Sequence, residues 1–143
     1  MATNAEKLQQ VAQTVISDCL REGINVMRYD AKRSNSIYLK FDDGIVGSMR
    51  ISDHPSNKRL KYKYNIVLGS KRIKRTNGCH MNLYTDLDDV QWIMRQVKRN
   101  YVAHKARLGT EVYQKLMKKN RDLADRTKGF WASAKYITQE EIK

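Results

Sequence analysis

Acidic residues are missing from a long stretch in the middle of the chain. Between Asp53 and Asp86 the sequence contains no aspartate or glutamate, yet it contains eight lysines and arginines. Charges of one sign repel one another and destabilise a compact state unless an oppositely charged partner neutralises them. A polyanion would neutralise them and release its own counterions. This absence favours nucleic acid as the first partner to consider.

Cysteine, proline and long apolar runs are scarce as well. Cys19 and Cys79 are far apart and form no Cys-x-x-Cys pair, which argues against a disulfide scaffold or zinc site and fits a reducing cytoplasm. No apolar run reaches the roughly 18 residues of a membrane-spanning helix, and the N-terminus lacks the order of a signal peptide. We therefore expect a cytoplasmic protein, with no membrane, metal or cofactor.

What the chain does contain is an excess of positive charge. Its 143 residues include 28 basic and 15 acidic ones, for a formal net charge of +13, and the sequence pI is about 9.9. Such a pI is typical of nucleic-acid-binding domains, although an anionic lipid surface or a merely solvated surface would also suit it. Hydrophobic residues make up 41% of the chain, which is enough for a core.

Hydrophobic periodicity predicts a helix followed by a series of strands. Apolar residues recur at helical spacing over residues 5–22, and Gly23 is a stop signal. Period-2 alternation then predicts strands over residues 24–29, 36–41, 45–51 and 60–68, with a tight turn at Asp42-Asp43-Gly44. Such alternation indicates an antiparallel meander with one buried face.

Further helices are predicted after the strands. A helix capped at Thr85 is expected to run to Leu108, and a second one from Thr110 to about Leu123 with Val112, Leu116 and Leu123 pointing inward. The expected fold class is α+β, with an N-terminal helix, a three- to four-stranded antiparallel sheet and C-terminal helices. Residues 1–128 would form one domain. The tail, residues 129–143, would pack as a short segment or stay loose until a partner arrives.

The basic residues fall into three groups that could contact a partner. In the last predicted strand, Tyr62 and Tyr64 share the apolar face, so Lys61 and Lys63 would meet phosphate without base stacking. The loop at residues 70–78 could be an electropositive finger that orders on binding, or simply a hairpin tip. A stripe on the next helix would extend the surface or would be an ordinary solvated face. The candidate binding residues are Lys58, Arg59, Lys61, Lys63, Lys71, Arg72, Lys74, Arg75, Arg95, Lys98 and Arg99.

A catalytic interpretation has one candidate, the pair Asp53-His54, with His80 and His104 as possible helpers. The spacing of these residues matches no nuclease or metal motif. Asp53 follows a predicted strand and precedes Pro55, so we expect a turn residue that hydrogen-bonds nearby backbone. His104 falls on an apolar helix face, which is typical of a core histidine. We therefore expect no enzyme.

Residues 34–65 carry a recurring pattern: Ser34-x-Ser36-x-Tyr38, then Met49-Arg50-Ile51-Ser52-Asp53-His54, then Tyr62 and Tyr64. The segment, extended to about residues 34–100, resembles small proteins of phages and mobile elements of Gram-positive bacteria. Among these are anti-CRISPR proteins that disable type II RNA-guided nucleases. The basic loop before residue 80 and the helices after Gly109 depart from that pattern.

The resemblance implies a small α+β domain that inhibits an RNA-guided nuclease by binding, without catalysis of its own. The partner would be the nuclease, its guide RNA or its bound DNA, which such effectors hold in positively charged channels. Because this chain is basic, imitation of DNA is a poor explanation. Arg50 to His54 would then be mostly scaffold, and Lys58 to Arg75 the working surface. The alternative is a general DNA- or RNA-binding accessory protein from the same kind of genome.

Overall fold

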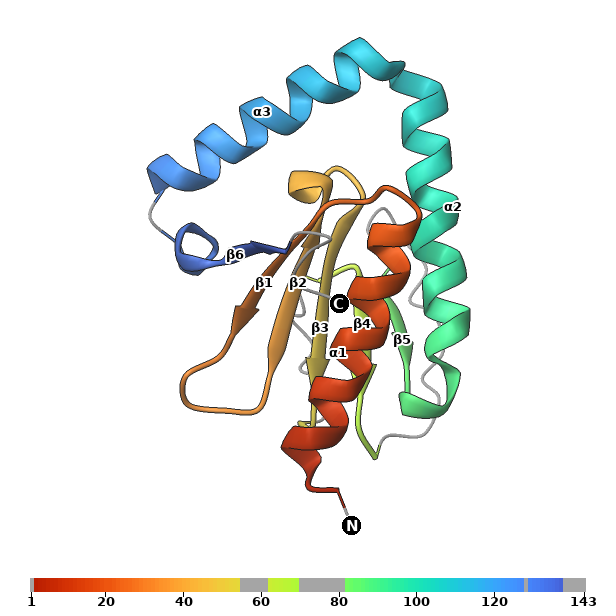
Figure 1. Cartoon of the computed structure of the whole chain (residues 1–143), viewed down its shortest axis with the longest axis vertical. Helices are drawn as coiled ribbons and strands as arrows, with labels where there is room; N and C mark the ends of the chain where they lie inside the picture. Colours follow the sequence, from red (N-terminus) through yellow and green to blue (C-terminus); the bar gives the residue numbers. More distant parts are fainter. Residues whose placement is uncertain (1, 55–61, 70–81, 128, 138–143) are drawn as a thin grey trace.

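A single mixed sheet organises the part of the chain that the structure describes. The structure, a computed structural model, describes residues 2–54, 62–69, 82–127 and 129–137. Two helices, α1 (Asn4–Arg21) and α2 (Val90–Leu108), pack side by side over one face of the sheet. A third helix, α3 (Thr110–Thr127), crosses one end of the sheet (Figure 1).

Six strands build this sheet among the described residues. They are β1 (Val26–Asp30), β2 (Ile37–Phe41), β3 (Gly47–Ser52), β4 (Tyr64–Val67), β5 (Leu83–Thr85) and β6 (Lys135–Ile137). Their order across the sheet is β5-β4-β3-β2-β1-β6. Strands β1, β2 and β3 form an antiparallel meander, as the alternation predicts. Strand β6 pairs antiparallel with β1, so part of the predicted tail joins the sheet.

The α+β class is confirmed, but the prediction of three or four purely antiparallel strands is wrong. Strand β4 runs parallel to β3, and β5 runs parallel to β4. All four β4 residues are buried, which is typical of a parallel strand covered on both faces. Strands β5 and β6 have three residues each, too few for a period-2 pattern to stand out.

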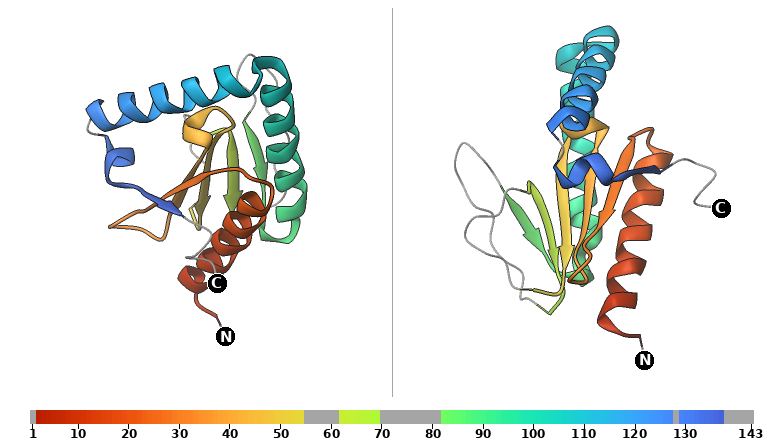
Figure 2. Two further views of the ribbon diagram at one scale, coloured as in Figure 1. Left: turned by 45° about the horizontal axis from the view of Figure 1, so that its top comes forward. Right: turned by 90° about the vertical axis from the view of Figure 1, so that its left-hand side faces the viewer.

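One apolar core lies between the sheet and the first two helices. It joins Leu8 and Val15 of α1 to Leu39 of β2, Ile66 of β4 and Ile93 of α2, each at most 1% exposed. The right-hand view of Figure 2 shows α1 standing against one side of the sheet. The residues at the alternate positions of each strand therefore lie on the opposite face of the sheet, away from α1.

The helix boundaries follow from capping groups. Thr3 caps α1 by accepting a hydrogen bond from the Glu6 N–H. The predicted cap at Thr85 is displaced: Thr85 ends β5, and Asp86 caps a short 3-10 turn, η2 (Leu87–Asp89), from which α2 continues. None of the described helices is both long and apolar enough to cross a lipid bilayer.

Helix α3 packs through a different edge from the one predicted. Val112 and Leu123 are about half exposed, whereas Tyr113 and Met117 are buried. Polar contacts favour this orientation: the Tyr113 hydroxyl donates to the carboxylate of Asp42, and Arg121 donates to the carboxylate of Asp43.

The turn between β2 and β3 is the polar anchor of the C-terminal region. Asp42 and Asp43 both have positive φ and are buried within the short 3-10 turn η1 (Asp42–Gly44). Asp42 accepts hydrogen bonds from the backbone N–H and side chain of Asn25. Asp43 accepts from Arg121 of α3 and Tyr136 of β6. Two carboxylates thus connect the meander to α3 and to the edge strand.

Candidate nucleic-acid interface

Most of the basic residues predicted to bind a partner lie outside the described part of the chain. These are Lys58, Arg59, Lys61, Lys71, Arg72, Lys74 and Arg75. The structure describes the other four: Lys63, just before β4, and Arg95, Lys98 and Arg99 of α2. The geometry of these four divides them into two groups.

Arg95 and Arg99 are exposed on α2, one helical turn apart, and could contact phosphate together. Lys98 lies beside them in sequence but is committed elsewhere. Its Nζ lies 3.0 Å from Asp18 Oδ1 and 3.9 Å from Glu22 Oε1, so it forms ion pairs with α1. The helical stripe therefore offers two exposed arginines and one lysine that joins the two helices.

The alternation predicts that the Lys63 side chain projects from the face opposite Tyr64. In the structure Lys63 is partly buried and does not project from that face. Its side chain lies close to Gly47, where an added Cβ would come within 3.2 Å of the Lys63 Cδ. Burial lowers the pKa of His104 on α2, and the positive charges of Arg107 and Lys63 lower it further. Lys63 is therefore near α2, on the helix-covered side. His104 itself is only partly buried.

Tyr62 lies on the other side of the sheet, which corrects its predicted place in the core. Strand β4 begins only at Tyr64, so strict alternation does not extend back to residue 62. The Tyr62 ring centroid is 5.1 Å from that of Tyr38, and the Tyr38 centroid is 6.3 Å from that of Tyr29. Three partly buried tyrosine rings thus follow one another on the sheet face opposite α1.

Two basic side chains share that face. Arg50 of β3 pairs in register with Tyr38, and it is close enough to Tyr62 to oppose the rise that burial causes in the tyrosine pKa. Lys40 of β2 points the same way, with its Nζ 4.6 Å from the ring centroid of Trp131. We call the set Tyr29, Tyr38, Lys40, Arg50 and Tyr62 the tyrosine face.

The segments on which the resemblance rests converge at one edge of this face. The Ser36 hydroxyl donates to the Ser52 hydroxyl at 3.0 Å, and Asn35 donates to Asp53 Oδ2 at 2.9 Å. The Ser52 hydroxyl also accepts from the His54 N–H at 3.1 Å. These contacts tie the start of β2 to the end of β3.

The contacts of Asp53 and His54 differ from the expectation that Asp53 hydrogen-bonds nearby backbone. The Asp53 carboxylate accepts a hydrogen bond from the side chain of Asn35, which lies between β1 and β2. The local turn contact that was expected of Asp53 is made instead by the hydroxyl of Ser52. His54 Nε2 lies 3.4 Å from Asp53 Oδ1, but the two are not aligned as a hydrogen bond. Within the described ranges no three histidine, cysteine or acidic side chains gather closely enough to hold a metal ion.

No protein family, curated protein or solved structure matches this chain.

The acidic residues contribute less negative surface than their number suggests. Asp42 and Asp43 are at most 5% exposed, and Asp18 lies largely buried against Lys98 and Arg21. By contrast, Lys118 and Lys119 of α3 project into solvent. The ion pairs of Asp43 with Arg121 and of Asp18 with Lys98 neutralise acidic and basic charge together, so the excess of basic residues in the sequence remains.

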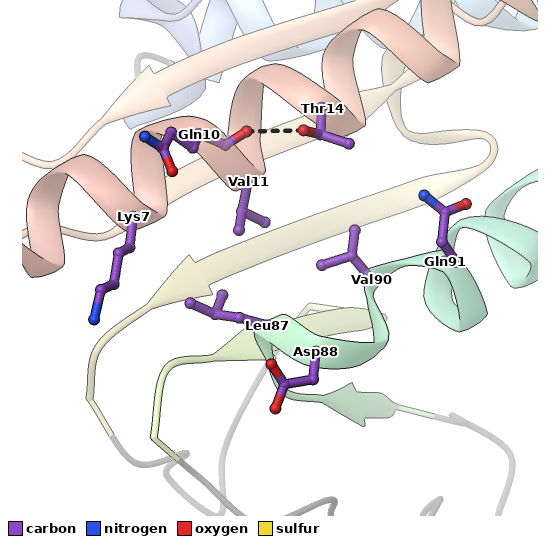
Figure 3. A pocket seen from close by; sticks show the side chains of 8 residues that line it. All are labelled: Lys7, Gln10, Val11, Thr14, Leu87, Asp88, Val90 and Gln91. Carbon is purple, nitrogen blue, oxygen red and sulfur yellow. Dashed lines mark hydrogen bonds between the residues drawn. The ribbon is translucent and has the colours of Figure 1, made fainter. Parts of the chain in front are cut away.

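A separate groove of about 390 Å³ lies between α1 and the start of α2 (Figure 3). Val11, Leu87 and Val90 line it with apolar side chains, and Lys7 and Asp88 lie at its border. This groove provides one cation and one carboxylate beside aliphatic groups. Among the described residues that line it, Asp88 is the one carboxylate, whereas paired acid–base chemistry needs two titratable groups.

Proposed function

We propose that this protein binds nucleic acid, free or within a nucleoprotein, through its basic surface and without catalysis of its own. The observation that carries the proposal is the excess of positive charge. Arg95 and Arg99 are exposed on α2, on a chain of net charge +13. Phosphate groups are the partner that such a surface attracts most strongly.

A finer proposal follows from the resemblance to type II anti-CRISPR proteins. On this proposal the protein inhibits a bacterial RNA-guided nuclease by binding the nuclease together with its guide RNA or target DNA. The convergence of Asn35, Ser36, Ser52 and Asp53 where β2 begins and β3 ends supports it, because these contacts give the resembling segment a defined shape. Binding by a general DNA- or RNA-associated accessory protein is the alternative.

The experiment that tests the coarse proposal is a salt titration of binding. Labelled single-stranded RNA, single-stranded DNA and duplex DNA are mixed with the full chain, and the dissociation constant is followed between about 50 mM and 200 mM salt. We expect a steep loss of affinity with salt. Reversing Lys71, Arg72, Lys74 and Arg75 to glutamate should weaken binding and flatten the slope, since each lost phosphate contact reduces it by nearly one.

A matched control separates specific contacts from total charge. Reversing four exposed basic residues of α3, Lys115, Lys118, Lys119 and Arg126, changes the net charge by the same amount on another element. If both quadruple variants lose affinity equally, the loop is not the site. If the wild-type chain binds none of the nucleic acids at the lowest salt, nucleic-acid binding by the free protein is refuted.

The finer proposal is tested with a reconstituted type II nuclease loaded with guide RNA. An inhibitor should bind the loaded complex more tightly than free oligonucleotides and stop target cleavage near a one-to-one ratio. A general binder should inhibit only at concentrations that coat the DNA. Cleavage that continues with saturating protein would exclude inhibition of that nuclease.

A further inference from the structure

The tyrosine face has a composition that the structure of the core does not require. On each strand the residues that point toward α1 and α2 supply the apolar core, while the alternate residues supply three tyrosines and two cations. A face that only had to be covered by protein could be aliphatic. Aromatic rings beside cations are instead the combination that binds unpaired bases.

The spacing of the rings suits consecutive bases. Tyr29 of β1, Tyr38 of β2 and Tyr62, which precedes β4, follow one another across this face, with centroid separations of 6.3 Å and 5.1 Å. All three keep part of their surface exposed. The ring planes are tilted by 42° and 46° relative to one another, so bases stacked on neighbouring rings need not stay parallel.

The charges on this face favour a polyanion. Among the described residues of β1 to β4 that point to this side, the charged ones are Lys40 and Arg50, and both are cationic. Arg50 pairs in register with Tyr38 and lies near Tyr62. Its guanidinium group can therefore contact a phosphate or stack on a base while the adjacent rings hold the neighbouring bases.

A hydrogen-bond acceptor without a donor lies on the same face. Asn65 pairs in register with Arg50 and is fully buried. Its Nδ2 donates to the Tyr62 carbonyl at 2.8 Å, while its Oδ1 has no partner. A buried acceptor without a donor is costly, and this one lies beneath the tyrosine face, at the register position beside Arg50.

We infer that the tyrosine face binds single-stranded nucleic acid by stacking unpaired bases on Tyr38 and Tyr62, with Arg50 as the adjoining cationic group. The inference rests on the proposed nucleic-acid binding and makes it more specific. Because α2 covers the other face of the sheet, the cation that adjoins the stacked bases is Arg50 of this face rather than an arginine of α2. The tyrosine face distinguishes a strand with accessible bases from a duplex, in which the bases are already stacked and paired.

The test compares probes that differ only in their bases. Labelled single strands of about 12 nucleotides, one of RNA and one of DNA, are compared with an abasic strand of equal length and with duplex DNA. Wild-type protein should bind the base-containing single strands more tightly than the abasic one. Tyr62→Ala and Tyr38→Ala should each weaken that binding by about 5- to 100-fold and leave the abasic strand unaffected.

Conservative variants keep the test independent of folding. Tyr62→Phe retains the ring and should retain affinity, whereas Tyr62→Leu retains bulk without aromatic stacking and should behave like Tyr62→Ala. Arg50→Gln should weaken binding of all probes. Arg50→Lys should restore the affinity for the abasic strand more than the affinity for the base-containing strands, since lysine keeps the charge but not the planar group. Comparison of the RNA and DNA arms identifies which strand is preferred.

The possible outcomes distinguish this inference from the proposed nucleic-acid binding on which it rests. If all probes bind with steep salt dependence but the abasic strand binds as well as the others, and Tyr62→Leu changes nothing, base stacking is wrong while nucleic-acid binding stands. If no probe binds at low salt, both are wrong. A preference for duplex over single strands that Tyr62→Leu leaves unchanged would also overturn the inference.

Discussion

The two faces of the sheet differ in chemistry although the same strands build both. On the face that α1 and α2 cover, Ile37, Leu39 and Phe41 of β2 are essentially inaccessible to solvent. Between them on the same strand, Tyr38 and Lys40 are only partly buried. The period of two along a strand thus lets one short segment supply both core residues and a surface that could meet a partner.

The comparison indicates where stability and function are separated. Removing atoms from the helix-covered face leaves a cavity, because the surrounding side chains are closely packed. Changing the tyrosine face alters chemistry at partly exposed positions, where the fold tolerates substitution better. Substitutions on neighbouring residues of one strand should therefore have different consequences.

The largest expected effect is on the helix-covered face. Leu39→Ala should lower the free energy of unfolding by about 2–5 kcal/mol, because it removes a fully buried side chain and leaves a cavity. Ser48→Ala, on the opposite face of the adjacent strand β3, should change it by less than about 0.5 kcal/mol. Denaturant titration of both variants measures the difference. Equal losses would mean that the two faces are not distinct in packing.

The second effect concerns the anchor at the end of the sheet. Asp42→Ala removes the acceptor for Asn25 and Tyr113 and should cost about 2–3 kcal/mol, since buried donors lose their partner. Hydrogen exchange should rise in α3 more than in α1. Asp42→Asn is the control, because it keeps an acceptor oxygen and tolerates the positive φ of this position. Unchanged exchange in α3 after Asp42→Ala would contradict the anchoring role.

Part of the fold could be predicted because local patterns determine it. The meander of β1, β2 and β3 follows from alternation and from the Asp-Asp-Gly turn, and α1 follows from its apolar stripe and Gly23. The parallel pairing of β4 with β3 depends on how the chain returns between them, which short-range periodicity does not encode. The orientation of α3 involves hydrogen bonds to distant residues, from Tyr113 to Asp42 and from Arg121 to Asp43.

The site was less predictable than the fold. The positive charge is evident in the sequence, but the ring array requires Tyr29, Tyr38 and Tyr62, which come from three separate segments. Extending the alternation of β4 by two residues placed Tyr62 on the wrong face. Grouping these residues on one face requires knowing that Tyr38 lies opposite Arg50, and this register is known only once β2 and β3 are paired.

A smaller effect distinguishes the two kinds of basic residue on α2. Lys98→Met should lower stability by about 0.5–1 kcal/mol by breaking its ion pair with Asp18, a modest effect because Lys98 is partly exposed. It should leave the salt dependence of nucleic-acid binding unchanged. Arg99→Gln should do the reverse, with no measurable loss of stability and a shallower salt slope. If Lys98→Met flattens the slope as well, its ion pair opens when the partner binds.

The smallest effect is a shift in the titration of His104. Arg107 donates a hydrogen bond to His104 Nδ1, and burial together with the charges of Arg107 and Lys63 lowers the histidine pKa below 6.5. The unfolded chain therefore takes up this proton first as the pH falls, so the contribution of His104 to stability is present above pH 6.5 and is lost as the pH drops through the folded-state pKa. Titration of the histidine ring proton by NMR, assigned with His104→Gln, measures this.

Lys63→Gln should raise the pKa of His104 slightly by removing a nearby positive charge, and a bound strand whose phosphates lie near Lys63 should raise it too. A pKa that is unchanged by a saturating single strand would exclude phosphate from the helix-covered side near Lys63 and would leave the tyrosine face and the loops as the places where the strand is held.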